Sequence, residues 1–191
     1  LPWLYKRSYF LEHFERMVYQ LISFLVNGTE GLKNQYARHY QLPIAKIKVL
    51  PNWIDTDRFR QKSNSSQSLK SRLNISNSEK VVLFTHRLSR RKGAHYLPEI
   101  VKLLRGESVV LLIAGGGPEK ENLESSIKHL TLLNKVRFLG CVPNKEIQDY
   151  FGIADVFIMP SEEEGFPHVL LEAMAGGIPY VAFDVGGVQE I

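Results

Sequence analysis

Residues 156–183 read VFIMPSEEEGFPHVLLEAMAGGIPYVAF, and this stretch decides the fold class. The apolar run at 156–159 predicts a buried strand, and a second apolar run follows at 180–183. Between them, the apolar residues of 168–175 have the spacing of a helix that packs against a sheet. Strand, helix and strand in direct succession are typical of a βαβ unit, whose two strands are parallel.

The same alternation runs upstream from residue 81. Apolar runs at 81–85, 109–114 and 136–139 predict three more strands, and helices are expected at 94–104, 119–130 and 145–151. Continuous apolar strands that alternate with helices indicate a parallel sheet covered on both faces. The predicted fold class is therefore α/β, with a Rossmann-like parallel sheet and right-handed crossovers.

The first 52 residues follow a different pattern. Helical spacing predicts a helix over 9–22, and its aromatic residues Phe10 and Phe14 are expected to pack in a core together with Trp3. Short apolar runs at 23–26 and 47–50 predict strands, and Asn27 or Thr29 is expected to cap a helix that ends near residue 40. Residues 60–79 are polar and predict a connection with one short helix near 69–73.

Composition excludes several classes of protein. The 191 residues are 44% hydrophobic and 23% charged, as in soluble globular proteins. The net charge of +4 suits anionic ligands, but no basic cluster is long or aromatic enough to predict nucleic-acid binding. No apolar run is long enough for a transmembrane helix. The single cysteine, Cys141, excludes an internal disulfide framework and fits a reducing compartment.

The turn after the 81–85 strand is basic and reads THRLSRRKG over 85–93. It places Arg87 and Lys92 at a strand-to-helix corner, beyond the carboxyl end of a strand, where such sheets bind ligands. A forked guanidinium, a compact ammonium and the N–H groups of a helix start together suit a diphosphate. A merely solvated basic turn is the alternative on charge alone.

The turn after residue 159 is acidic. Glu164 lies in the loop, and Glu172 lies a little over one turn inside the following helix. The two carboxylates could therefore accept hydrogen bonds from two polyol parts of one ligand that lies across the helix start. Gly165 allows backbone to approach that ligand closely. A favourable placement of carboxylates near a helix dipole is the alternative.

Five segments, taken in order along the chain, resemble those of glycosyltransferase family 4, whose members have the GT-B fold. Residues Glu164 to Glu172 resemble its E-x7-E motif, and Arg87 with Lys92 resembles its Arg…Lys pair. The other three resemble the interdomain segment (IKVLPNWIDTDRF, 47–59), the base-binding turn (GCVPNKE, 140–146) and the strand and turn after the motif (AGGIPYVAFDVGGVQE, 175–190). The resemblance covers nearly the whole chain from about Phe14 onward.

The resemblance implies a role for each matched residue. Arg87 and Lys92 would hold the donor diphosphate, Glu172 would accept bonds from the ribose, and Glu164 would hold hydroxyls of the transferred sugar. Arg87, Lys92 and Glu164 are the catalytic candidates. The remaining candidates are backbone groups around Gly165, Phe166 and His168 beside the sugar, and a surface for the base at Cys141, Val142 and Pro143.

The resemblance also implies that no metal or other cofactor is needed, because Arg, Lys and a helix dipole neutralise the diphosphate. Asp55-Thr56-Asp57 spells a D-x-D metal motif but lies in the interdomain segment. Two positions depart from the family pattern, since His86 and Pro167 stand where Gly is frequent. Pro167 removes one N–H donor to the sugar, so the donor preference stays open.

The implied activity is retaining transfer of a hexose from a nucleotide diphosphate sugar to a glycan or lipid-linked acceptor, as in polysaccharide biosynthesis. An epimerase of the same fold and a non-catalytic nucleotide-binding module are the alternatives. Residues 1–52 would be the end of the acceptor-side domain. Residues 53–191 would be the donor-binding domain, truncated at its C-terminus, so the fragment alone is expected to be inactive.

Location follows from the same resemblance. A cytoplasmic protein is expected, with a glycan or lipid-linked acceptor as its partner. The aromatic and basic stretch Trp3–Arg7 leaves peripheral association with the cytoplasmic face of a membrane as an open hypothesis. A packed helix start explains that stretch equally well.

Overall fold

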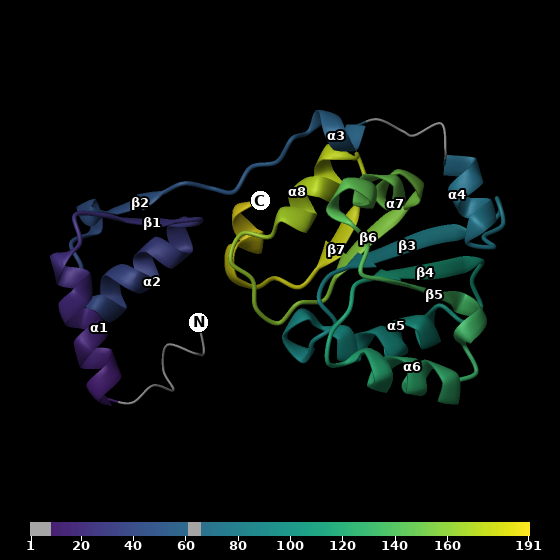
Figure 1. The fold of residues 1–191 in the computed structure, drawn as a ribbon, viewed down its shortest axis with the longest axis horizontal. Helices are drawn as coiled ribbons and strands as arrows, with labels where there is room; N and C mark the ends of the chain where they lie inside the picture. The colour runs from purple at the N-terminus through teal and green to yellow at the C-terminus, as the bar shows by residue number, and fades with distance from the viewer. Residues whose placement is uncertain (1–8, 61–65) are drawn as a thin grey trace. The chain divides into compact units, whose positions relative to one another are not determined.

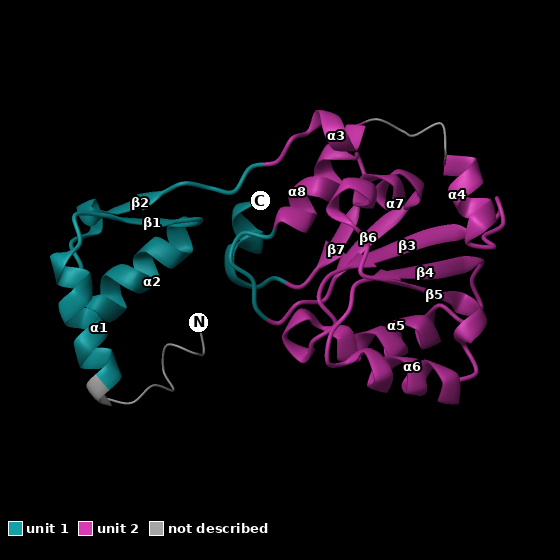
Figure 2. Cartoon of the chain, in the orientation of Figure 1, with its two compact units in different colours: residues 1–53, 163–167, 184–191 teal, residues 54–162, 168–183 magenta. Residues whose placement is uncertain are grey.

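The computed structural model describes residues 9–60 and 66–191 (Figure 1). The chain divides into two compact units (Figure 2). Unit 1 comprises residues 1–53, 163–167 and 184–191, and unit 2 comprises residues 54–162 and 168–183. No helix within the described ranges is both long and apolar enough to cross a membrane. The stretch Trp3–Arg7 lies outside the described residues.

In its described residues, unit 1 contains two helices and a two-stranded parallel sheet. Its elements are α1 (Tyr9–Leu21), β1 (Leu25–Asn27), α2 (Glu30–Tyr40), a 3-10 turn at Ile44–Lys46, β2 (Ile47–Val49) and a 3-10 turn at Gly186–Glu190. Of the two predicted cap residues, Thr29 is the one that caps α2, because its Oγ1 accepts a hydrogen bond of 3.0 Å from the Leu32 N–H. The Glu190 carboxylate accepts from the N–H groups of Glu30 and Gly31, each at 2.8 Å, so two sources satisfy the free donors of this helix start.

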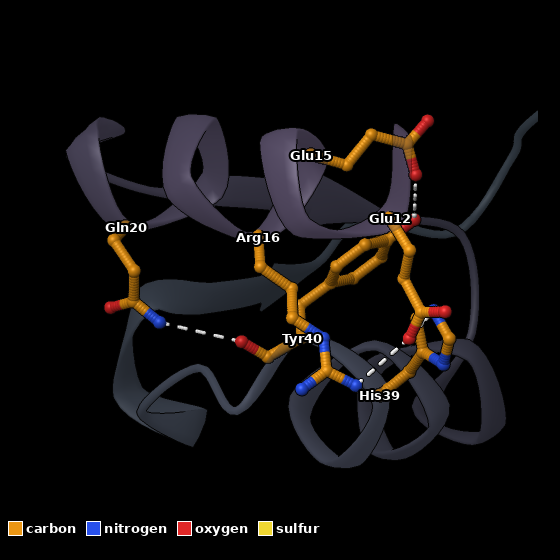
Figure 3. Close-up of polar contacts among 6 residues, drawn as sticks. All are labelled: Glu12, Glu15, Arg16, Gln20, His39 and Tyr40. Atoms are coloured by element: carbon orange, nitrogen blue, oxygen red, sulfur yellow. Dashed lines mark hydrogen bonds and ion pairs between the residues drawn. The ribbon is translucent and has the colours of Figure 1, made fainter. Parts of the chain in front are cut away.

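The core of unit 1 corrects the prediction for α1. Phe14 was expected to pack in a core, yet it is 51% exposed, and Leu21 on the same helix is 80% exposed. The opposite, polar side of α1 faces α2 (Figure 3), and the Tyr40 hydroxyl donates to Glu15 at 3.1 Å. Periodicity predicts that a helix is amphipathic but not which side meets its neighbour. Trp3 and the side chain of Phe10 lie outside the described residues.

Unit 2 is an α/β layer structure, as predicted. Its short leading helices are α3 (Asp57–Arg60) and α4 (Ser66–Arg72). The regular part that follows consists of β3 (Lys80–Thr85), α5 (Leu97–Leu103), β4 (Val109–Ala114), α6 (Lys120–His129), β5 (Val136–Gly140), α7 (Ile147–Ile153), β6 (Val156–Met159), α8 (His168–Ala175) and β7 (Tyr180–Ala182). Each predicted strand and helix from residue 81 onward is present, with ends shifted by few residues. The one-turn helix α3 was not predicted.

The five strands form one parallel sheet in the order β5-β4-β3-β6-β7. Lys80 pairs with Val109 and Val82 pairs with Val156, so β3 is central and its neighbours lie on either side. Helices α5 and α6 cover one face of the sheet, and α7 and α8 cover the other (Figure 1). The chain adds strands first on one side of β3 and then on the other, so the strand order reverses between β3 and β6. Ligands bind at such a reversal, beyond the carboxyl ends of the strands.

Buried apolar side chains hold the layers of unit 2 together. Strand β4 is nearly completely buried, as its continuous apolar run predicts for a central parallel strand. On the α7 and α8 face, Phe151 packs on Phe157 with ring centroids 5.5 Å apart. The cluster under α5 and α6 consists of Phe84, Leu88, Ala94, Leu97, Val101, Leu111, Ile113, Leu123, Ile127, Leu132, Val136 and Ile158. This core fixes the strand ends from which the candidate site is built.

Candidate functional site

The basic turn after β3 is joined to the turn after β6 at the point where the strand order reverses. The Glu162 N–H donates to the Arg91 carbonyl at 2.9 Å. Gly93 has φ +75°, and a Cβ built there would lie 1.8 Å from the Pro160 carbonyl oxygen. Only glycine satisfies both the backbone conformation and this contact. The two charged turns picked out in the sequence therefore start side by side at one edge of the sheet.

The glycine run at 115–117 lets the turn after β4 pass close to the turn after β3. A Cβ on Gly115 would lie 1.9 Å from the His86 carbonyl oxygen, and one on Gly117 would lie 2.3 Å from that of Leu88. The Leu88 N–H donates to the Gly116 carbonyl at 2.9 Å. Glycine at residues 115 and 117 therefore allows the backbones of the two turns to approach each other closely.

A hollow of about 410 Å³ lies within unit 2, beyond the carboxyl ends of β3, β4 and β5. Four of the predicted donor-site residues line it together: Arg87, Cys141, Val142 and Glu172. Its other lining residues are Thr85, His86, Ala114, Gly115, Gly116, Asn144, Ile147 and Val169. Residues from three strand ends and from α8 therefore converge, although they are far apart in the sequence.

The remaining predicted residues of unit 2 do not line this hollow. Lys92 ends the 3-10 turn Arg90–Lys92, next to Gly93. Pro143 precedes the 3-10 turn Asn144–Glu146, with its carbonyl accepting from the Glu146 N–H at 2.9 Å. His168 is the first residue of α8 and is exposed. For these three residues a ligand contact stays a prediction.

The hollow is lined by charged side chains of both signs. Arg87 is exposed and presents a cation on the β3 side. Glu172 is partly buried in α8, and burial raises the pKa of its carboxyl, while the positive charge of Arg58 opposes that rise. Among the described residues, no group donates a hydrogen bond to the Glu172 carboxylate. Its oxygens can therefore accept bonds from a ligand.

Cys141 stands at the rim of the hollow, directly after β5. The thiol is exposed, and a Cβ built on Gly116 would lie 2.8 Å from its sulfur. A side chain larger than hydrogen at residue 116 would therefore displace the thiol. Gly116 and Cys141 together set the shape of this edge.

Glu164, Gly165 and Phe166 belong to unit 1, where the loop 163–167 is held by several backbone contacts. Glu164 is only 8% exposed. The Gly165 carbonyl accepts from the Gly187 N–H at 2.8 Å, and the Phe166 carbonyl accepts from the Asn52 side-chain amide at 2.7 Å. Gly186 has φ +55° and lies too close to the Glu164 carbonyl for any Cβ. The joint action of Glu164 with the residues of unit 2 stays a prediction.

The two departures and the D-x-D sequence have local structural roles. His86 accepts a 2.8 Å hydrogen bond at Nδ1 from the Arg87 N–H, so it orients the backbone of the turn after β3. Pro167 is buried in unit 1. The Asp55 carboxylate accepts from the Asp57 N–H at 3.1 Å and caps α3. Within the described ranges, no group of three His, Cys, Asp or Glu side chains has a geometry that suits a metal ion.

Sequence reasoning missed several residues that support the turns. The Tyr96 hydroxyl donates to Glu162 at 3.1 Å, and the His95 Nε2 lies 3.3 Å from the same carboxylate oxygen. Asn144 lines the hollow and accepts from Arg58. The sequence carries no signal for these contacts, since each joins elements that are distant along the chain.

Comparisons with known proteins identify the family of the chain. Residues 65–191 match the sequence profile of "Glycosyl transferases group 1". The chain belongs to the group 1 glycosyl transferases. An uncharacterized glycosyltransferase of Methanocaldococcus jannaschii is 34% identical to this group 1 chain over 170 residues, which is 87% of the chain and 44% of that protein.

Two further proteins are similar to this glycosyl transferase chain. The GDP-mannose-dependent alpha-(1-6)-phosphatidylinositol monomannoside mannosyltransferase of Mycobacterium tuberculosis is 34% identical over 157 residues, covering 78% of the chain and 40% of that protein. The crystal structure of Anabaena HepE in complex with UDP and glucose superimposes with a TM-score of 0.84 at 24% identity, over 96% of the chain and 51% of that protein. The GT-B fold is thereby shown, and the chain spans about half the length of these proteins or less.

Proposed function

We propose that the hollow of unit 2 binds the nucleoside diphosphate part of a nucleotide sugar, and that the parent protein is a retaining hexosyltransferase of family 4. The observation that carries the proposal is the convergence of Arg87 and Glu172 on one hollow beyond the carboxyl ends of β3, β4 and β5. A cation suits the diphosphate, and a carboxylate with free oxygens suits the ribose hydroxyls.

The proposed chemistry is transfer with retention of the anomeric configuration. The bond between the anomeric carbon and the diphosphate oxygen breaks, and a new bond to the acceptor hydroxyl forms on the same face of the sugar. The acceptor proton passes to the departing phosphate oxygen. Arg87 and Lys92 stabilise the developing charge on the diphosphate, Glu164 holds the sugar, and no metal is required.

The similar proteins support a nucleotide-sugar donor but leave the base open. The Mycobacterium tuberculosis mannosyltransferase is named for GDP-mannose, whereas Anabaena HepE was crystallised with UDP and glucose. A glycan or lipid-linked acceptor, a role in polysaccharide biosynthesis and a place on the cytoplasmic face of a membrane belong to the same proposal. The proposal also includes the expectation that these 191 residues alone bind the donor weakly and do not transfer the sugar.

Cys141 provides a direct test of the binding site. It is the sole cysteine of the chain, it is exposed, and it lines the hollow. A nucleoside diphosphate bound there should shield the thiol from alkylation by iodoacetamide. At a ligand concentration ten times Kd, the alkylation rate should fall about tenfold, since only unoccupied protein reacts. Mass spectrometry after timed quenching measures that rate for UDP, GDP and ADP.

Two variants control this measurement. Arg87→Ala should move the protection curve to higher nucleotide concentration, because it removes the cation beside the diphosphate. Arg105→Ala removes an exposed cation that does not line the hollow and should leave the curve unchanged. Equal alkylation rates with and without every nucleotide would show that the hollow is not the donor site. Product analysis with a full-length enzyme then separates transfer from epimerisation.

A further inference from the structure

Arg58 occupies a defined position next to the hollow without lining it. Its Nε donates to the Gln148 side-chain oxygen at 2.9 Å, and its NH2 group donates to the Asn144 side-chain oxygen at 3.2 Å. Its guanidinium carbon lies 5.2 Å from the centre of the Phe59 ring. A planar guanidinium with two directed bonds and one aromatic neighbour has a single preferred orientation.

These bonds hold the turn that follows β5. Asn144 lines the hollow, whereas Gln148 lies on α7 and donates from its own amide to the Lys145 carbonyl at 2.7 Å. Arg58 therefore binds the segment 144–148 through two side chains, those of Asn144 and Gln148. The bond to Asn144 fixes the orientation of a side chain that borders the hollow. The 3-10 segment of the turn has no side-chain cap, so the bond from Arg58 to Asn144 adds a restraint to the backbone bond between the Glu146 N–H and the Pro143 carbonyl.

The charge of Arg58 also acts on Glu172. Helix α3, which carries Arg58, packs against α8, which carries Glu172. Burial disfavours the ionised form of the Glu172 carboxyl, and the Arg58 cation favours it. The Arg58 cation thus counteracts the effect of burial on the Glu172 carboxyl, to which no group of the described residues donates a hydrogen bond.

We propose that Arg58 is a positioning residue for the nucleoside end of the donor site, acting through Asn144 and Glu172. It fixes the position of the turn that borders the base. It also favours the ionised form of the Glu172 carboxyl, whose oxygens accept hydrogen bonds from the ribose hydroxyls. This inference rests on the proposed function of the hollow. It predicts that Arg58 matters for the nucleoside and not for the diphosphate, whose cation is Arg87.

A purely structural role makes a different prediction. Phe59 is buried and packs on Phe151 with ring centroids 5.6 Å apart, so α3 has its own anchor on α7. Replacing Arg58 by Met retains a long apolar stem over Phe59 and removes the charge and both hydrogen bonds. If Arg58 only held α3 in place, its loss would change stability and would affect all ligands of the hollow alike.

The test compares nucleoside diphosphates with inorganic pyrophosphate by NMR titration of the chain. Arg58→Met should raise the Kd of UDP or GDP roughly three- to tenfold, the range for one or two hydrogen bonds, and change that of pyrophosphate less than about twofold. The matched control is Arg60→Met, which removes an equal charge from the same helix turn. The Arg60 side chain is 69% exposed and pairs with Asp57 at 3.7 Å, so neither Kd should change.

A double-mutant cycle tests the route through Glu172. In a Glu172→Gln background, the effect of Arg58→Met should shrink, because the carboxylate on which its charge acts is gone. Should Arg58→Met fail to fold, Gln148→Met removes one of its acceptors without touching the hollow and must show the same selective loss. Equal weakening of pyrophosphate and nucleotide, unchanged nucleotide affinity in Arg58→Met, or full additivity in the cycle each overturns the proposal. Absence of nucleotide binding in the unmutated chain instead overturns the function of the hollow.

Discussion

Gly93 links the basic turn to the strand end at β6, and its replacement by Ala should be costly. The φ of +75° disfavours any side chain, by about 1–2 kcal/mol. The new Cβ would also lie 1.8 Å from the Pro160 carbonyl oxygen, whereas real contacts of this kind stay beyond 3.0 Å. The two turns must then separate by at least 1.2 Å, which is 3.0 minus 1.8.

That separation breaks the contacts that join the turns. The 2.9 Å bond from the Glu162 N–H to the Arg91 carbonyl and the 3.1 Å bond from Tyr96 to Glu162 both cross the same gap. Losing one or two hydrogen bonds of this type costs about 1–3 kcal/mol. Together with the backbone strain, Gly93→Ala should lower the free energy of unfolding by about 2–5 kcal/mol.

Gly177 provides the matched control. It has φ +67°, but a Cβ built there meets no atom within 4 Å, so Gly177→Ala carries the backbone strain alone. Urea unfolding followed by circular dichroism should give a loss of about 1–2 kcal/mol for Gly177→Ala and a clearly larger loss for Gly93→Ala. Equal losses in the two variants would refute the reasoning, because the contact with Pro160 would then contribute nothing.

Two further predictions concern pH. Burial raises the pKa of Glu172, so its ionised form lowers the stability of the chain at pH values above the ordinary glutamate pKa. Glu172→Gln should therefore stabilise the unliganded chain at neutral pH. Urea unfolding should show that this gain disappears as the pH falls to the ordinary glutamate pKa. For Asp155, burial acts to raise the pKa, but the hydrogen bonds from Lys80 and the Val81 N–H outweigh it and lower the pKa. The stability from Asp155 is thus present above the ordinary aspartate pKa and lost as the pH falls through the lowered value. Asp155→Asn should cost about 1–2 kcal/mol at neutral pH and less in acid, and thermal unfolding at both pH values measures the difference.

The candidate site was predictable to the extent that its signals are local. Arg87 follows a strand end that an apolar run reveals, and Glu172 lies in the helix after another such strand. Cys141 and Val142 were assigned through the family resemblance, and all four residues line one hollow. The contribution of Asn144 as an acceptor for Arg58 has no such signal, because nothing near either residue indicates the other. Likewise, the apolar side of α1 was identified from spacing, but its exposure depends on which neighbours the helix has.

By itself, the sequence determined the succession of strands and helices from residue 81 onward and the position of the charged turns beyond the strand ends, and it limited the cap of α2 to Asn27 or Thr29. Such features depend on a few neighbouring residues, whose apolar spacing and hydrogen-bonding groups are visible in order along the chain. Only the tertiary structure decided that β6 pairs with β3 and that the sheet order is β5-β4-β3-β6-β7. Any apolar strand can pair with any other through the same backbone groups, so the order depends on how all the layers pack at once. The meeting of Arg87 with Glu172, and of Arg58 with Asn144, is a consequence of that packing.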